Sequence, residues 1–323
     1  MTPSEDIEKK NRIAITRQRN NNFSWLIADY LTQHPCLITP ELMESVNPGK
    51  AMPEEVIYRA LLTGFCGLDT ENDEEDKYLA DEYFPLSVKK LNPGVYLGNP
   101  YYRDIIIPEV TTGNWKLTHE RYQPYEAFIY NDILVGPDLK EIPRVGFFSE
   151  EFLFPAVLEH DHEWMAIKPN EIETMQPVLD VIEGRVVTFG LGLGYFAYMA
   201  SLREKVQHIT IIEQDDQVIQ LFKQHILPQF QRPDKVEIIC AEAFEYAGTQ
   251  MPAQSFDYAF VDLWHDVSDG LEPYLRMKKL EPVNQRTRFF YWIEKSLISG
   301  LRWQVFDWAM RKAGSGEESA FPR

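Results

Sequence analysis

The stretch TFGLGLGYFA, residues 188–197, has three glycines on alternate positions between an apolar run and a segment of helical character. Glycine has no Cβ, so the backbone can turn sharply here and approach a ligand closely. A dinucleotide-binding G-x-G-x-x-G loop would need its third glycine where Tyr195 stands, and no Gly-Lys-Ser/Thr follows as in a P-loop. We therefore expect the loop to pass beneath a ligand smaller than a dinucleotide.

Apolar runs and helical segments alternate regularly around this loop. Continuous apolar strands separated by helices indicate a parallel sheet that is covered on both faces. The sequence therefore predicts an α/β, Rossmann-like fold for this region. The expected strands are residues 185–189, 208–213, 235–240 and 256–262, and the expected helices follow the first two of them.

Acidic residues at the ends of the second and third strands complete a pattern with the loop. Glu213 lies 19 residues after Gly194, and Glu242 follows the third strand beside Ala243. The segment 185–262 resembles the class I S-adenosylmethionine-dependent methyltransferases, especially the spermidine synthase-like branch. The resemblance implies that Gly190, Gly192 and Gly194 pack against the methionine part of S-adenosylmethionine, Glu213 holds the ribose hydroxyls, Glu242 faces the adenine amine and Ala243 lies beside the ring. The chemistry agrees, because a carboxylate accepts hydrogen bonds from a diol and free loop amides suit a carboxylate ligand.

The run VDLWHDVSDGL, residues 261–271, lies at the carboxyl end of the fourth strand, where open α/β sheets build their sites. Its candidate catalytic residues are Asp262, His265 and Asp266. Spermidine synthases have acids where this chain has Leu193 and His265, which weakens the interpretation of the chain as an aminopropyltransferase. We expect a methyltransferase acting on an unidentified small molecule. A spermidine synthase-like aminopropyltransferase and a non-catalytic cofactor-binding protein remain alternatives.

The chain has 323 residues, with 50 acidic and 32 basic side chains and a net charge of −18. The negative electrostatic potential of such a chain repels the phosphate backbone of DNA or RNA, so the composition disfavours nucleic acid as a partner. Its three cysteines have no paired spacing, which favours a reducing compartment. No apolar run approaches the roughly 18 residues of a membrane span. We expect a cytoplasmic protein that binds a small-molecule substrate and no membrane.

The residue composition and the spacing of apolar residues divide the chain into three regions. Residues 1–110 are expected to be mainly helical, 111–168 to form a small β-rich hairpin module, and 169–323 to form the Rossmann-like domain with a C-terminal helix. His160 and His162 alternate on a hairpin, but no further ligand cluster accompanies them, so no metal site is predicted.

Apolar residues recur every fourth position from Phe289 to Ala309, which predicts one long amphipathic helix ending near Gly314. The parallel sheet is therefore expected to be shortened at its C-terminal end, with one edge of the strand at 256–262 unpaired. An exposed apolar edge invites association. We expect the aromatic helix, with Trp292, Trp303 and Trp308, to cover that edge or to form a homodimer contact.

Overall fold

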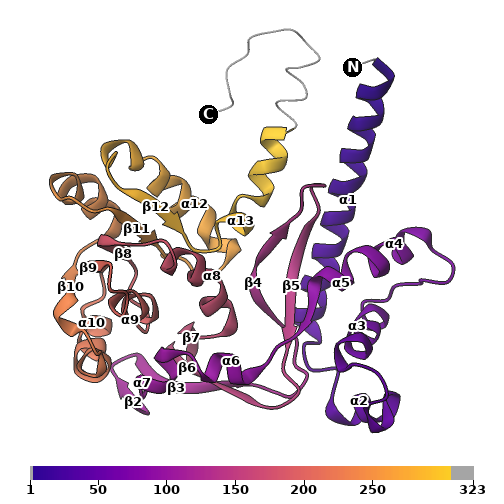
Figure 1. Ribbon diagram of the computed structural model, residues 1–323, viewed down its shortest axis with the longest axis horizontal. Helices are drawn as coiled ribbons and strands as arrows, with labels where there is room; N and C mark the ends of the chain where they lie inside the picture. Colours follow the sequence, from indigo (N-terminus) through magenta and orange to yellow (C-terminus); the bar gives the residue numbers. More distant parts are fainter. Residues whose placement is uncertain (1–2, 307–323) are drawn as a thin grey trace.

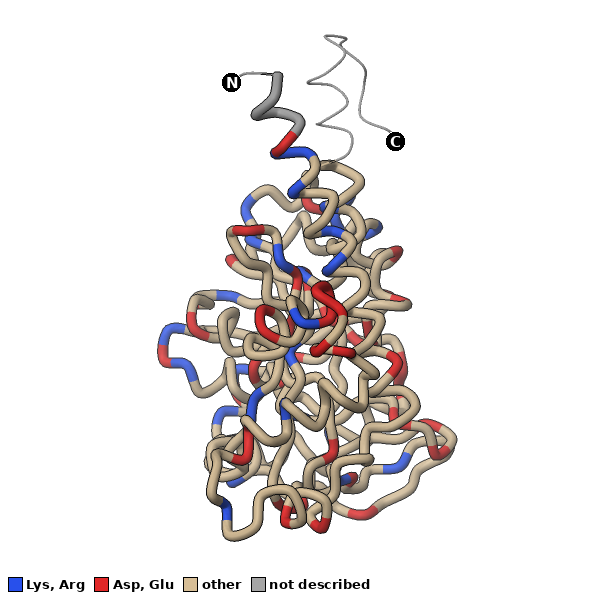
Figure 2. Tube along the Cα trace, turned by 90° about the vertical axis from the view of Figure 1, so that its right-hand side faces the viewer, with Lys and Arg blue, Asp and Glu red and all other residues tan. Residues whose placement is uncertain are grey.

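The computed structural model describes residues 3–306, with side chains from residue 8 onward. The chain forms three sheets (Figure 1): a parallel sheet of five strands, an antiparallel sheet of four, and a mixed sheet of three beside the N-terminal helices. Within these residues, no helix has the length and apolar character needed to cross a membrane. Acidic positions occur at many places along the Cα trace (Figure 2).

The parallel sheet has the strand order β10-β9-β8-β11-β12. Its first four strands in the chain confirm the expected α/β fold with a parallel sheet, and their order is compatible with a Rossmann-like arrangement. The chain moves from β8 to one side for two strands and then returns to the other side, so the strand order reverses between β8 and β11. Ligands of open α/β sheets bind at such a switch point. The strands are β8 (Gly184–Phe189), β9 (Val206–Glu213), β10 (Val236–Cys240), β11 (Tyr258–Val261) and β12 (Arg288–Tyr291).

The fifth strand, β12, corrects the prediction of one long C-terminal helix. Phe289 lies in a strand that pairs in parallel with β11, so neither edge of β11 is unpaired. The four-residue spacing describes only the part after Ile293, where α13 (Glu294–Leu297) begins. Pairing with β11 outweighs the helical periodicity of this short aromatic run. No antiparallel strand joins this sheet within residues 3–306. Trp308, Ala309 and Gly314 lie outside the described residues.

Helices cover both faces of the parallel sheet. Asp215 and Asp266 begin two of these helices by accepting hydrogen bonds from main-chain amides of the first turn, the usual N-cap arrangement. The buried core between the layers includes Val187, Ile211 and Phe260. The helices are α8 (Pro169–Leu179), α9 (Tyr195–Ser201), α10 (Asp216–Leu221), α11 (Ala243–Glu245) and α12 (Val267–Lys278).

The N-terminal helices have their own core against the mixed sheet. Phe23 and Phe84 meet edge to face, and Tyr58 stacks on Phe147 with ring centroids 3.8 Å apart. The expected helical region is therefore not separate, since β1 (Val88–Lys90) pairs with β5 (Glu141–Phe147) beside β4 (Phe128–Val135). The helices are α1 (Pro3–Gln33), α2 (Pro40–Val46), α3 (Glu54–Phe65), α4 (Glu74–Glu82) and α5 (Phe84–Ser87).

The antiparallel sheet lies between these two parts and closes with a tight hairpin. His160 and Asp161 have positive φ angles of 50° and 63°, which turn the chain directly from β6 to β7. Within the described residues, no group of three or more His, Cys, Asp or Glu side chains could hold a metal ion. Its strands are β2 (Val110–Thr112), β3 (Trp115–Tyr122), β6 (Phe152–Glu159) and β7 (His162–Ala166), preceded by α6 (Pro93–Leu97) and α7 (Pro100–Asp104).

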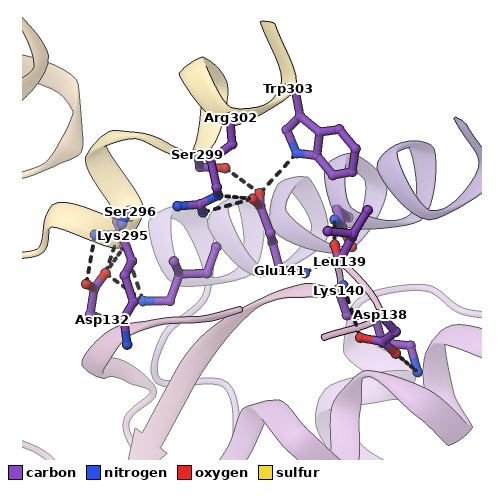
Figure 3. A network of polar contacts seen from close by, with 12 residues as sticks. Asp132, Asp138, Leu139, Lys140, Glu141, Lys295, Ser296, Ser299, Arg302 and Trp303 are labelled. Atoms are coloured by element: carbon purple, nitrogen blue, oxygen red, sulfur yellow. Dashed lines mark hydrogen bonds and ion pairs between the residues drawn. The ribbon is translucent and has the colours of Figure 1, made fainter. Parts of the chain in front are cut away.

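The segment after β12 docks on the β4–β5 hairpin through two buried or half-buried acids (Figure 3). The Glu141 carboxylate accepts hydrogen bonds from Arg302 Nε at 2.8 Å and Trp303 Nε1 at 3.3 Å, and it also bonds the Ser299 hydroxyl. Asp132 accepts hydrogen bonds from the amides of Lys295 and Ser296, the first turn of α13. These contacts tie the last described segment to the N-terminal half.

Candidate functional site

Two cavities meet at the switch point of the parallel sheet. The small cavity has a volume of about 220 Å³ and lies over the carboxyl ends of β8, β9 and β10. The large cavity has a volume of about 470 Å³ and lies between the parallel sheet, β4 and α1. Both are lined by Asp262, Trp264 and His265 from the loop after β11, and by Trp164 and Met165 from β7.

Five of the six residues predicted to bind a cofactor line the small cavity: Gly190, Gly192, Glu213, Glu242 and Ala243. Gly190 has a φ of +100°, and a Cβ there would come within 2.1 Å of the Asp262 main-chain oxygen. This close approach of β8 and β11 is open only to glycine. Gly192 also has a positive φ, of 50°, and faces the Met165 sulfur.

The sixth residue, Gly194, lies elsewhere. A Cβ at this position would meet the ring of Phe222 on the far side of the loop, and Gly194 lines neither cavity. Its φ of +73° starts α9, whose first residue, Tyr195, is buried. Gly194 therefore lets the chain turn into the helix, and direct contact with a ligand in the small cavity falls to Gly190 and Gly192.

Glu213 ends β9 and braces the glycine loop. One of its oxygens accepts hydrogen bonds from the amides of Gln214 at 2.7 Å and Asp215 at 2.9 Å. The other, Oε2, accepts from the Leu191 amide at 3.3 Å. A carboxylate oxygen has two lone pairs, so Oε2 keeps one acceptor site for a ligand hydroxyl.

Glu242 has a structural task as well as a place in the cavity wall. Its carboxylate accepts a 2.7 Å hydrogen bond from the Glu245 amide and so forms the N-cap of α11. Ala243 is buried beside it, and the ring of Phe244 is covered by the Arg276 guanidinium at 3.9 Å from its centroid. This end of the small cavity therefore offers a flat, partly apolar surface with one carboxylate at its edge.

The glycine loop has fewer free amides than the sequence suggested. The amide of Gly190 donates to Ile212 and that of Gly194 to Leu191, while Leu193 donates to the Met165 sulfur at 3.2 Å. Leu191 is bound to Glu213 as described. Within residues 3–306, only Gly192 among residues 190–194 has an amide without such a partner. The loop therefore offers a ligand carboxylate one main-chain hydrogen-bond donor, the amide of Gly192.

Asp262 and Glu171 are carboxyl groups of the large cavity with no hydrogen bond or ion pair to another described residue. Glu171 belongs to the first turn of α8, and Asp262 follows β11. Burial raises the pKa of Asp262 to about 7. Burial, and then the charge of Asp262, raise the pKa of Glu171 well above its usual range. The charge of Lys168 opposes the shift of Glu171, but Lys168 is paired with Glu163, so a bound cation would supply the positive charge that the two carboxyl groups lack.

His265 and Asp266 also line the large cavity, but they are exposed and engaged in the start of α12. The Asp266 carboxylate accepts from the Ser268 amide at 2.6 Å as the N-cap, with Asp269 completing a capping box. His265 Nδ1 lies 2.9 Å from Asp269, and its ring meets Trp164 edge to face at 4.4 Å. Of the three predicted catalytic residues, only Asp262 is left without a structural partner.

Leu193, which stands where spermidine synthases have an acid, is fully buried, so this position contributes no side chain to either cavity.

The sequence did not reveal Glu171, Trp164 or Met165 as site residues. Glu171 looked like an ordinary acid in the first turn of a helix, where acids favour the helix dipole. Trp164 and Met165 follow the His162 position on β7, and only the fold brings this strand onto the glycine loop. The sequence signal that could have suggested them is that alternate residues of β7 share a face, and that face meets the glycine loop in the folded protein.

Neither the protein-family models nor the curated proteins with which the sequence was compared match it. The methyltransferase resemblance therefore depends on the residues of the site themselves.

Proposed function

We propose that this protein binds S-adenosylmethionine in the small cavity and transfers its methyl group to a small amine in the large cavity. The observation that carries the proposal is the position of Asp262. It lies where the two cavities meet, with the glycine loop and Glu213 on one side and Glu171 on the other.

The residues of the small cavity fit this cofactor. Glu213 Oε2 keeps an acceptor site for a ribose hydroxyl, and Glu242 lies at the edge of a surface formed by Ala243 and Phe244 that suits an adenine ring. Gly190 and Gly192 let the loop pack closely against Asp262 and Met165, which keeps its backbone low along the wall of the small cavity. When bound, the cofactor supplies a sulfonium methyl group that is already activated toward a nucleophile.

The large cavity supplies what an amine acceptor requires. An ammonium ion must lose a proton before its nitrogen can form a bond to carbon, and Asp262, with its raised pKa of about 7, is suited to accept that proton near neutral pH. The incoming ammonium favours the ionised form of Glu171 and so offsets the effect of burial on its pKa, and the carboxylate then balances the positive charge of the amine. Trp164 and Trp264 line both cavities and so place apolar ring surface at their junction.

Cofactor identity is tested by thermal shift with S-adenosylmethionine, S-adenosylhomocysteine, decarboxylated S-adenosylmethionine and NAD in parallel. A ligand at 100 times its Kd stabilises the folded protein by about 2.7 kcal/mol, which such a measurement detects readily. We expect stabilisation by the first two compounds. Stabilisation by NAD alone would overturn the cofactor assignment.

Methyl transfer is tested with Asp262→Asn. Loss of the proton acceptor should lower kcat/KM by about 10²- to 10⁴-fold, the usual contribution of a general base. His265→Ala should slow transfer by less than about tenfold, because a ring bound to Asp269 serves only to position the loop. Asp216→Asn, an exposed change in the first turn of α10, is the matched control. Equal rates for Asp262→Asn and Asp216→Asn would contradict the role of Asp262.

Aminopropyl transfer is a second candidate, favoured by the occupied amides of the glycine loop. A donor without a carboxylate would not need them. Tighter binding of decarboxylated S-adenosylmethionine than of the carboxylated form, with spermidine formed from putrescine, would favour this candidate over methyl transfer.

A further inference from the structure

The lining of the large cavity is divided between two kinds of side chain. Its acidic side, Glu171 and Asp262, comes from α8 and the end of β11. Its other side comes from α1 and β4, which Figure 1 shows on the far side of α8 from the parallel sheet.

The side formed by α1 and β4 is mostly apolar. Residues three and four apart on a helix share a face, and on β4 register shifts break the usual alternation, so consecutive residues reach the cavity. The lining residues are Ser24, Ile27, Ala28 and Leu31 on α1, and Ile129, Asn131, Asp132 and Ile133 on β4.

The other charged residues of the large cavity are already engaged. Asp132 accepts the hydrogen bonds of Ser296 and Lys295, and Glu163 is paired with Lys168. Arg144 donates to the Tyr130 hydroxyl at 2.6 and 2.9 Å, and Tyr130 is not part of the cavity wall. Asp266 caps α12 through the Ser268 amide. Among the described carboxyl groups that line the cavity, Glu171 and Asp262 are therefore the two without a hydrogen bond or ion pair, and they are left to attract a cation.

From this division we propose that the acceptor is a monoamine with an apolar chain, its ammonium group at Glu171 and Asp262 and its chain between α1 and β4. The inference deepens the proposed function and rests on it. A diamine would place its second ammonium among Ile27, Leu31 and Ile133, where no free carboxylate receives it, and burying an unpaired charge is costly.

Binding is measured by tryptophan fluorescence and calorimetry, because Trp164, Trp264 and Trp292 line the large cavity. The probes are butylamine, hexylamine, 1-hexanol, putrescine and 1,6-diaminohexane, each titrated without cofactor and with saturating S-adenosylhomocysteine. Each buried methylene should tighten binding by roughly fourfold, equivalent to about 0.8 kcal/mol. Hexylamine should bind at least about tenfold more tightly than the diamine or the alcohol.

Two variants locate the two ends of the ligand. Glu171→Gln should remove most of the preference of hexylamine over 1-hexanol, whereas Glu173→Gln, on the same helix and bonded to Tyr96 outside the cavity, should keep it. Ala28→Trp should fill the apolar side of the cavity and weaken the binding of hexylamine by at least about tenfold. The binding of methylamine, titrated as an additional probe without a chain, should change little. Asp29→Trp, one position along and outside the cavity wall, is its control.

Equal binding of diamine and monoamine, no gain with chain length, or no amine binding with or without S-adenosylhomocysteine would overturn the inference. These outcomes differ from failure of the proposed function, which is absence of S-adenosylhomocysteine binding while the amines still bind.

Discussion

The two cavities differ in how much of the chain is needed to build them. Apart from Trp164 and Met165, the small cavity is lined by residues 190–273, a stretch within one parallel sheet. The large cavity takes residues from Ser24 to Ser296, from strands of the mixed and antiparallel sheets and from the segments that follow β11 and β12 of the parallel sheet. A site made at consecutive strand ends leaves a local pattern in the sequence. A site made by distant segments leaves none, because its pattern exists only after folding.

Among variants expected to affect ligand binding in one cavity more than in the other, Gly192→Val should have the largest effect. A branched side chain at a φ of +50°, against the Met165 sulfur, strains the loop and fills the small cavity. S-adenosylhomocysteine affinity should fall by at least about 100-fold, measured by calorimetry, with hexylamine binding changed far less. Gly64→Ala, in α3 with no neighbour within 4 Å of the added Cβ, is the control. Equal loss of both ligands would show that the cavities behave as one site.

A smaller effect is expected from Glu213→Ala. The lost hydrogen bond from a ligand hydroxyl to a carboxylate is worth about 1.5–3 kcal/mol, which is roughly a 10- to 150-fold weaker Kd for S-adenosylhomocysteine. Glu237→Ala, on the neighbouring strand and paired with His208, should bind normally. Glu213 also accepts hydrogen bonds that hold the glycine loop, so Glu213→Ala could disturb the loop itself. Glu213→Gln is therefore measured as well, because glutamine keeps the volume of the side chain and one acceptor oxygen. Normal binding by folded Glu213→Ala protein would leave the ribose assignment without support.

The smallest effect concerns the large cavity and depends on pH. The folded protein raises the pKa of Asp262 to about 7 and raises that of Glu171 as well, so it binds more protons than the unfolded chain from about pH 4 upward. Their contribution to stability is present below pH 4 and is lost as the pH rises through 7.

Glu171→Gln removes one of these groups and its repulsion of Asp262. Its Tm should match that of the wild type at pH 4.5 and exceed it by about 2–6 °C at pH 8, at about 2–4 °C per kcal/mol. Differential scanning calorimetry across this range checks the prediction, with the exposed change Glu183→Gln as the control. A Tm gain that is the same at both pH values would argue against a titrating pair.

The contrast between the cavities also explains what the sequence could predict. The glycine loop, Glu213, Glu242 and the four strands around them follow local rules of turn chemistry and apolar runs, and the structure has them where expected. The fifth strand was missed because Phe289 fits a helical spacing as well as a strand, and only its pairing with β11 decides between them.

The different position of Gly194 and the place of Glu171 in the site were not foreseen for a related reason. The three glycines look equivalent in the sequence, but the position of Phe222 against Gly194 assigns that residue to the turn into α9. The approach of Glu171 to Asp262 joins residues 91 positions apart in the chain, and no local pattern encodes it.

The docking of the segment after β12 on the β4–β5 hairpin has a consequence for the order in which the protein matures during synthesis. Residues 190–273 leave the ribosome before residues 292–296, which complete the wall of the large cavity beside α1. Contacts between such distant parts of a chain form late, because a long loop must close first. A nascent chain can therefore acquire its glycine loop and the acids around it while the large cavity still lacks a wall, and the segment after β12 is anchored only when Arg302 and Trp303 reach Glu141.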